Sequence, residues 1–163
     1  DPDPVIFVEH KGLYAMKAEV SQPLAAIPLG QAAHRCAIGC LTVVTYGAGV
    51  AVSLAAAEQL AAEGIQVEVL DLQSLQPWDE AAVLESLVRT GHLVIVHEAV
   101  EAFGAGAEIA ARMADIGFAH LKGPIIRVGA PFTPVPFAAA LEARYRPSAE
   151  RVVAAIRQTL GKE

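Results

Sequence analysis

The sequence predicts an α/β fold in which a mostly parallel sheet lies between two layers of helices. Three observations lead to this prediction: short apolar runs alternate with amphipathic stretches, the apolar runs are continuous, and glycine or proline residues separate them. Continuous apolar strands are typical of a sheet covered on both faces, because neither face then carries polar side chains. The 163 residues are enough for one domain with a substantial core.

The stretch from residue 41 to residue 71 predicts a strand–helix–strand unit. The run 41–46 is rich in β-branched residues and leads into Gly47, as expected for a buried strand that enters a tight turn. An amphipathic helix is predicted over 50–63, ending at Gly64, and a second strand over 67–71. A unit of this length requires parallel strands with a right-handed crossover.

The same alternation continues along the rest of the chain. Before this unit, we expect a strand over residues 5–8 that is buried on both faces, and a short strand over 34–37. After it we expect a helix from Asp79 to about Arg89, a strand over 92–96, and a helix from the Gly104-x-Gly106 segment to Gly117. A strand over 124–128 and a proline-rich loop over 129–136 are expected next. The chain then continues with a short helix carrying Phe137, Leu141 and Tyr145 and a terminal helix from Ser148 to Gly161.

The composition excludes several classes of protein. Hydrophobic residues make up 54% of the chain and charged residues 18%, which excludes a disordered chain. No apolar run approaches the ~20 residues that cross a membrane. The net charge of −6 and the lack of a basic cluster argue against a nucleic-acid partner. Two cysteines are too few for a disulfide scaffold and no signal peptide is predicted, so we expect an intracellular protein that is not secreted.

A dinucleotide-binding fingerprint is partly present in the first unit. Gly47-x-Gly49 follows a strand, and Asp71 ends the next strand 24 residues after the first glycine. Val52 stands where the fingerprint requires a third small residue. An ordinary strand–helix turn is therefore the simpler interpretation, and a free-standing dinucleotide-binding domain stays as the alternative function.

Two further groups of residues could carry chemistry. Gly104-x-Gly106 could bind an anion at a helix N-terminus, but Glu98 and Glu101 would repel it, so we predict that the Glu98 carboxylate caps this helix. His97 and Glu98 could act as an acid–base pair, but adjacent strand residues point to opposite faces of a sheet.

A soft-metal site is the other possibility. His34, Cys36 and Cys40 lie within seven residues, yet structural zinc needs four ligands. We predict instead that the two thiols are buried and pack as small hydrophobic groups. The residues themselves predict no catalytic, cofactor-binding or metal-binding side chain.

Several short motifs occur in order along the chain. They are Asp3-Pro4-Val5 with Glu9-His10-Lys11-x-Leu13-Tyr14, Val44-Thr45-Tyr46-Gly47, Val69-x-Asp71-Leu72-x-Ser74-Leu75-x-Pro77-x-Asp79, Thr90-Gly91-His92 with His97-Glu98-Ala99, Gly104-x-Gly106-Ala107-Glu108-Ile109, and Arg127-Val128 with Thr133-Pro134-Val135-Pro136. This ordered set resembles the β subunit of the thiamine-diphosphate-dependent 2-oxoacid dehydrogenase E1 (pyruvate or branched-chain type), in its transketolase C-terminal-like domain.

The resemblance implies a three-layer α/β/α sandwich with a five-stranded, mostly parallel sheet whose first strand, around residues 34–37, is antiparallel. It implies that residues 1–14 are the last strand and tail of a missing pyrimidine-binding domain, residues 15–32 a linker, and residues 33–163 the transketolase C-terminal-like domain. The parent enzyme would use thiamine diphosphate and Mg²⁺ to decarboxylate a 2-oxoacid oxidatively and acylate lipoyl-E2. The motifs that bind this cofactor are absent here, so we expect this chain to bind none and to be inactive alone.

The resemblance also implies partners and a location in the bacterial cytoplasm or the mitochondrial matrix. The partners are a second β subunit and the E1 α subunit, in a homodimer or larger oligomer. The expected interface residues are Glu98, Glu101, Phe103, Gly104, Phe132, Pro134, Pro136 and Phe137. Phe132 stands where an Asp is common and Glu101 where a basic residue is common. The family pattern suggests an acidic docking surface for the peripheral subunit-binding domain of E2, whereas His120 and Lys122 make this stretch basic.

Overall fold

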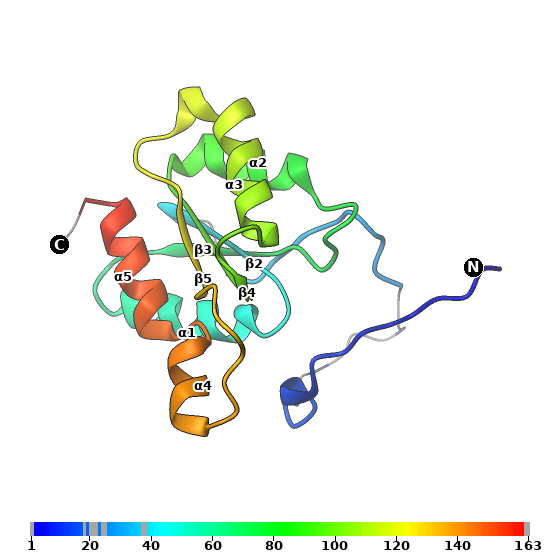
Figure 1. Ribbon diagram of the computed structural model, residues 1–163. Coiled ribbons are helices and arrows are strands. Elements are labelled where there is room, and N and C mark those ends of the chain that lie inside the picture. The colour runs from blue at the N-terminus through cyan, green and yellow to red at the C-terminus, as the bar shows by residue number, and fades with distance from the viewer. Residues whose placement is uncertain (1, 18, 20–22, 24–25, 37–38, 162–163) are drawn as a thin grey trace.

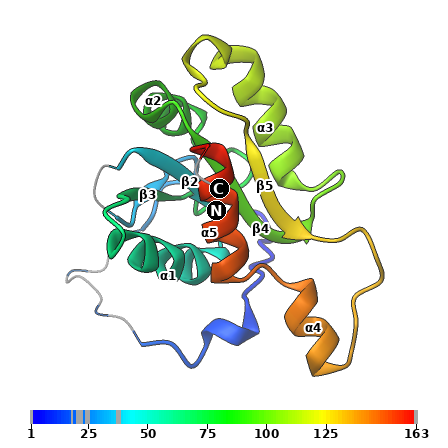
Figure 2. The same ribbon diagram turned by 90° about the vertical axis from the view of Figure 1, so that its left-hand side faces the viewer.

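A computed structural model of the chain describes residues 2–17, 19, 23, 26–36 and 39–161. Figures 1 and 2 show three layers, with α2 and α3 on one face of the sheet and α1 and α5 on the other. The elements are β1 (Ala33–His34), β2 (Leu41–Thr45), α1 (Gly49–Ala61), β3 (Val67–Asp71), α2 (Glu80–Thr90), β4 (Leu93–Val100), α3 (Ala105–Ile116), β5 (Ile126–Ala130), α4 (Ala139–Tyr145) and α5 (Ala149–Thr159), with single 3-10 turns at Lys11–Leu13 and Phe118–His120.

The five strands form one sheet in the order β1-β3-β2-β4-β5. β1 is antiparallel to β3, with Ala33 opposite Asp71, and the other neighbouring strands are parallel. The predicted sandwich and its antiparallel first strand are therefore confirmed. β1 is shorter and begins earlier than the predicted 34–37, and residue 37 lies outside the described residues.

Each face of the sheet has its own core. Leu41 and Val43 pack with side chains of α1 and α5, while Val44 packs with side chains of α2 and α3. All five residues of β2 and all five of β3 are buried, as the continuous apolar runs predicted. Helix ends follow the sequence signals: the Asp79 carboxylate accepts a hydrogen bond from Ala82 N–H, and the Ser148 hydroxyl accepts one from Arg151 N–H.

The predicted strand over residues 5–8 is not formed in this chain. Within the described residues it pairs with no other strand, and the side chains from Val5 to Val8 are 70–90% exposed rather than buried. An extended segment without a neighbouring strand has nothing to bond its backbone or cover its side chains. Figure 1 shows this end of the chain leading away from the sheet. The domain assignments for residues 1–14 and 15–32 stay predictions.

The four parallel strands end at one edge of the sheet, here called the carboxyl edge. A glycine turn follows β2, the segment 101–104 follows β4, and the loop 131–138 follows β5. Val100 and Ala130 pair at the ends of β4 and β5, so the last two loops begin side by side, as Figures 1 and 2 also show. Among the described residues, no helix has the length and apolarity to cross a membrane.

Candidate functional site

His97 is fully buried at the carboxyl edge, on the face of the sheet that α3 covers. Its Nδ1 lies 2.9 Å from the Ala99 carbonyl oxygen, and its Nε2 lies 3.2 Å from Gly106 N. A carbonyl only accepts and an N–H only donates, so the ring proton is on Nδ1 and Nε2 accepts. The ring also stacks on Tyr46, at a centroid distance of 6.3 Å. His97 is thus a neutral side chain that bonds the N-terminus of α3.

This geometry corrects the prediction that Glu98 caps α3. A capping side chain was expected, but the residue is His97, because adjacent strand residues alternate between faces and Glu98 points to the other face. The Gly104-x-Gly106 pattern has a steric cause. A Cβ at Gly106 would lie 2.2 Å from His97 Nε2, and one at Gly104 would lie 2.1 Å from the Val100 carbonyl oxygen.

Burial is the largest influence on His97, and it lowers the pKa of the imidazole because the charged form would lose its hydration. Three smaller effects also act on this pKa: the hydrogen bond to the Ala99 carbonyl raises it, nearby Arg127 lowers it, and nearby Glu101 raises it. A buried neutral histidine with both nitrogens bonded to backbone is poorly placed for proton transfer to a substrate. His97 and Glu98 do not act as an acid–base pair.

Glu98 lies on the opposite face, where it connects the N-terminal segment to the sheet. Its carboxylate is 2.8 Å from His10 Nε2, and both side chains are about one-third exposed. Glu98 also lines a pocket of about 210 Å³ together with Gly49 and Arg146. The Glu9-His10-Lys11 motif therefore contacts the carboxyl edge directly.

Glu101 holds the segment 101–104 against β5 and α5. Its carboxylate accepts hydrogen bonds from Gly129 N–H at 3.0 Å and from Arg151 Nη2 at 3.3 Å. Its own N–H donates to the Ala130 carbonyl at 2.9 Å, and the Arg127 guanidinium donates to its carbonyl. Glu101 was predicted as an interface residue, and the structure gives it these internal contacts.

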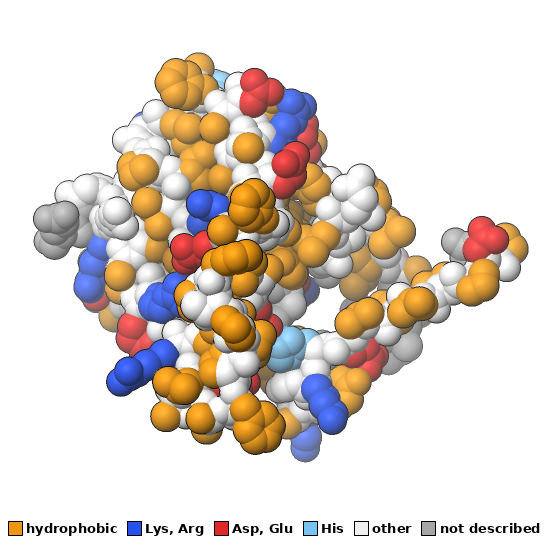
Figure 3. Space-filling view, in the orientation of Figure 1, with side chains coloured by type: hydrophobic (Ala, Val, Ile, Leu, Met, Phe, Trp, Pro, Cys, Tyr) orange, Lys and Arg blue, Asp and Glu red, His pale blue; other side chains and the backbone are white. Residues whose placement is uncertain are grey.

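Beyond Glu101, the carboxyl edge exposes large apolar side chains. Phe103 is 96% exposed and has a φ of 59°, a left-handed conformation that a residue with a Cβ rarely adopts. The exposed apolar residues from the two loops and α4 are Phe103, Phe132, Val135, Phe137 and Leu141, here called the carboxyl-edge patch. Figure 3 shows hydrophobic side chains gathered over α3, β5, the loop 131–138 and α4. Three predicted interface residues, Phe103, Phe132 and Phe137, are thus exposed in the segments that follow β4 and β5.

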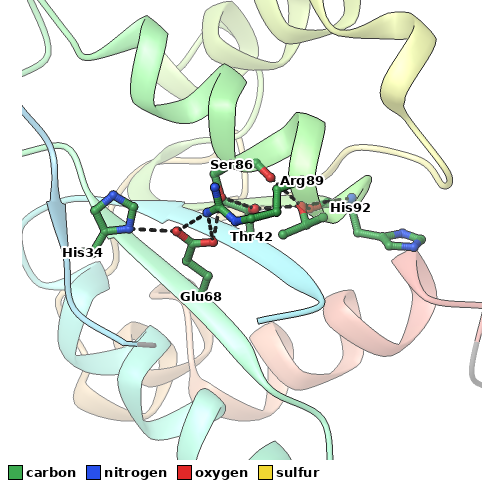
Figure 4. A network of polar contacts seen from close by, with 7 residues as sticks. His34, Thr42, Glu68, Ser86, Arg89 and His92 are labelled. Carbon is green, nitrogen blue, oxygen red and sulfur yellow. Dashed lines mark hydrogen bonds and ion pairs between the residues drawn. The ribbon is translucent and has the colours of Figure 1, made fainter. Parts of the chain in front are cut away.

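A second polar cluster lies far from this patch, beneath α2 (Figure 4). Glu68 is fully buried on β3, and its carboxylate contacts His34 Nδ1 at 2.8 Å, Ser86 Oγ at 3.0 Å and the Arg89 guanidinium. Ser86 in turn bonds Thr42 at 2.6 Å. This cluster was not predicted from the sequence, although a Glu inside an otherwise apolar strand was a signal for it.

The chain is similar to a known family over most of its length. Residues 30–152 match the family described as transketolase, C-terminal domain. The chain belongs to this family. Its fold agrees with a solved structure of a split gene transketolase in an inactive beta4 tetramer, at a TM-score of 0.74 and 30% identity, over 88% of this chain and 46% of that one. Transketolase from Pichia stipitis, 17% identical with a TM-score of 0.56, covers 82% of this chain and 18% of its own and supports the fold alone.

Curated relatives of this transketolase C-terminal domain are β subunits of larger enzymes. The β subunit of acetoin:2,6-dichlorophenolindophenol oxidoreductase from Cupriavidus necator is 45% identical over 98% of this chain and 47% of that protein. The β subunit of the pyruvate dehydrogenase E1 component from Rhizobium meliloti is 38% identical over 96% of this chain and 34% of that protein. The resemblance to E1 β subunits is confirmed, and the chain spans about half or less of the length of these relatives.

The carboxylates and histidines among the described residues do not converge on a site for a magnesium diphosphate. Among the described residues, no group of three or more His, Cys, Asp or Glu is placed to hold a metal ion. Magnesium bound to a diphosphate needs converging oxygen ligands. The carboxylates at the carboxyl edge instead bond other side chains and backbone, as Glu98 and Glu101 do. No step of thiamine-diphosphate chemistry can be assigned to these residues.

The candidate soft-metal ligands His34, Cys36 and Cys40 each contact different groups. His34 bonds Glu68, and Cys40 Sγ lies 3.3 Å from the Gln66 carbonyl oxygen. Cys36 is partly buried against the core, and burial raises the pKa of its thiol. The predicted buried packing of both thiols is wrong for Cys40, which is exposed directly before β2.

The dinucleotide alternative requires a free Asp71. Its carboxylate accepts hydrogen bonds from the Arg35 guanidinium at 2.7 Å and from Gln73 N–H at 3.2 Å. Gly49 is needed for packing, because a Cβ there would lie 2.3 Å from Thr45 Oγ1. These contacts favour the ordinary strand–helix turn over ribose binding.

Proposed function

We propose that this chain is the C-terminal assembly domain of an E1-type β subunit, in an enzyme that oxidises acetoin or a 2-oxoacid. The observation that carries the proposal is the identity of 38–45% to such β subunits over 96–98% of the chain. Two acetoin oxidoreductase β subunits, at 45% and 43%, are more similar than the pyruvate dehydrogenase β subunit at 38%. These identities favour acetoin over pyruvate or a branched-chain acid as the substrate of the parent enzyme.

Thiamine diphosphate and Mg²⁺ would be bound by parts of the enzyme outside this chain. Residues 1–14 would then belong to a preceding pyrimidine-binding domain and residues 15–32 to a linker. A separate neighbouring sheet would cover the exposed apolar run from Val5 to Val8.

The carboxyl-edge patch is the surface that we assign to assembly. Large exposed apolar patches on a soluble domain mark interaction sites. Phe103, Phe132 and Phe137 are 96%, 72% and 103% exposed, and aromatic residues are enriched at the centres of interfaces. The split gene transketolase structure is a beta4 tetramer, which supports association between β-type chains as well as with α subunits.

The proposal also includes the charge that an E2 docking segment would need in order to bind this chain. His120 and Lys122 are both exposed near the 3-10 turn after α3. A basic surface repels a basic docking segment. An E2 domain that binds residues 118–122 would therefore need to present acidic side chains.

Binding to the α subunit tests the proposed function. The chain, or the full β subunit that contains it, is mixed with the α subunit encoded with it and analysed by native mass spectrometry. We expect a complex, and we expect Phe132→Asp with Phe137→Asp to abolish it while Phe118→Ala, which lies outside the patch, leaves it intact. Turnover of acetoin or a 2-oxoacid by the chain alone, or titration heats showing tight binding of thiamine diphosphate with magnesium, would contradict the proposal.

A further inference from the structure

We propose that a pocket at the start of α1 binds a free α-amino acid with a short aliphatic side chain, in its zwitterionic form. The pocket has a volume of about 210 Å³, and two side chains of opposite charge, Glu98 and Arg146, line it together with residues of α1 and α4. This binding site goes beyond the proposed assembly role and does not depend on it.

The pocket lies where ligands commonly bind in an open α/β sheet. β2 and β4 are parallel neighbours, with Thr45 opposite Val96. The chain leaves β2 towards α1 on one face of the sheet and leaves β4 towards α3 on the other, as Figures 1 and 2 show. Such a divergence is a topological switch point, and ligands bind in the crevice outside the carboxyl ends of the two strands. Gly49, which follows β2, and Glu98, near the end of β4, both line the pocket.

Glu98 is the group that we assign to the ammonium of the ligand. One oxygen of its carboxylate, Oε2, lies 2.8 Å from His10 Nε2, and the side chain is about one-third exposed. The other oxygen can accept a hydrogen bond from an ammonium group, and hydrogen bonds between two charged groups are among the strong ones. Glu98 would repel a ligand that carries negative charge alone, so a simple carboxylate or phosphate fits the pocket less well than a zwitterion.

Arg146 and the first turn of α1 are placed to bind the carboxylate of the ligand. The Arg146 side chain is half-exposed, and its ion pair with Glu142 is long, at 3.8 Å, so its guanidinium donors can turn to a ligand. α1 is 13 residues long, and its first turn contains no acidic residue. The partial positive charge at the N-terminus of such a helix favours a carboxylate.

The hydroxyl of Thr45 is directed at the same turn. Thr45 is fully buried, and its Oγ1 has no hydrogen-bond partner among the described residues. This oxygen lies 2.3 Å from the position that a Cβ on Gly49 would occupy. Buried hydroxyls are normally hydrogen-bonded. A carboxylate oxygen at the start of α1 would give the Thr45 hydroxyl an acceptor, and Gly49 contributes no side chain that would separate the two groups.

The size and the remaining walls of the pocket restrict the side chain of the ligand. Drug-sized ligands occupy cavities of about 300–1,000 Å³. A pocket of about 210 Å³ therefore admits only a smaller molecule. Val52, Ala143 and Pro147 line it with side chains that have no hydrogen-bonding group. An aliphatic side chain such as that of valine fits these walls, whereas a polar side chain would stay unpaired against them.

Titration of the ¹⁵N-labelled chain with L-valine, followed by nuclear magnetic resonance, tests the site. We expect saturable shifts of the amide signals of Gly49, Val52 and Ala143, with a dissociation constant of about 1 mM or below. Isovalerate lacks the ammonium of valine and isobutylamine lacks its carboxylate, and we expect each to bind about 10-fold more weakly or less well still. Equal affinity for the three compounds, shifts confined to other parts of the chain, or no saturation by about 20 mM valine would overturn the inference.

Two pairs of variants separate the ligand-binding side chains from their neighbours. Arg146→Gln should weaken valine binding by about 10-fold or more, whereas Arg144→Gln, which alters an arginine of a different pocket, should leave the affinity unchanged. Glu98→Gln should weaken binding in the same way. His10→Ala is its control, because it removes the contact with His10 and keeps the carboxylate in the pocket.

The amide spectra of the four variants also show whether each one is folded. Equal effects within either pair of folded variants would overturn the inference. The complex with the α subunit is measured separately by native mass spectrometry, so the absence of valine binding would overturn this inference alone and leave the proposed function standing.

Discussion

Two polar clusters in this domain are built from similar side chains and have opposite surroundings. Beneath α2, the fully buried Glu68 carboxylate bonds the buried Ser86 and the partly exposed His34 and Arg89. At the carboxyl edge, Glu101 and Arg151 use their contacts to hold a segment that exposes an aromatic ring. The first cluster thus joins a strand to its helix, whereas the second holds an exposed surface in place.

Arg89→Ala should give the largest loss of stability. It leaves the buried Glu68 carboxylate without its guanidinium partner, and breaking a buried ion pair costs about 3–5 kcal/mol. Urea unfolding measures the loss. Arg112→Ala is the control, because its ion pair with Glu80 is exposed to solvent and should contribute little to stability. Equal losses in the free energy of unfolding would show that the Glu68–Arg89 pair stabilises the domain no more than the exposed Arg112–Glu80 pair does.

Gly106→Ala should have the next largest effect. The added Cβ would lie 2.2 Å from His97 Nε2, and overpacking of this kind costs about 1–3 kcal/mol. Thermal unfolding of the single variants and of Gly106→Ala with His97→Ala measures the coupling between the two sites. We expect the double variant to lose less than the sum of the single losses. Additive losses would mean that His97 and α3 do not pack as described.

The stability of the domain should fall as the pH falls below about 6.5, the ordinary pKa of histidine. Burial lowers the folded-state pKa values of His97 and of His92, so between those values and about 6.5 the unfolded chain binds protons that the folded chain does not. Stability from this source is therefore complete above about pH 6.5 and lost on acidification. Melting temperatures across pH 5–8 measure the slope. His97→Gln should flatten it, and an unchanged slope would contradict the buried neutral ring.

Phe103→Ala should have the smallest effect on the folded domain. A ring that is 96% exposed contributes under about 0.5 kcal/mol to stability. Urea unfolding at a concentration where the chain is monomeric measures this. A loss of 2 kcal/mol or more would show that the Phe103 ring packs against its own domain, and the two clusters would then no longer differ in the way described.

Sequence patterns predicted the layers of the fold because burial on both faces of a parallel sheet leaves a continuous apolar signal. They predicted that helices begin at Asp79 and Ser148 because the signals for a helix start are local. The strand predicted over residues 5–8 is not formed within this chain, since an apolar run shows that a segment can be buried and does not show what would cover it.

Residues of the candidate site were named from the sequence, but the contacts between them were not predicted. The exposed Phe103, Phe132 and Phe137 were selected through the family resemblance. Which of two adjacent residues caps α3 depends on the face each one occupies, and this follows only from the register of β4. The Glu68 cluster joins residues from β1, β2, β3 and α2, so no local spacing could reveal it.

Carbene footprinting of the carboxyl edge tests the central claim most directly. The chain is labelled alone at a concentration where it is monomeric and again after assembly with the α subunit, and the modification of Phe103, Phe132, Phe137 and Phe118 is quantified by peptide mapping. We predict that the first three are heavily labelled in the free chain and protected in the assembly, while Phe118 changes little. Equal labelling of the patch in both states would contradict its role as an assembly surface.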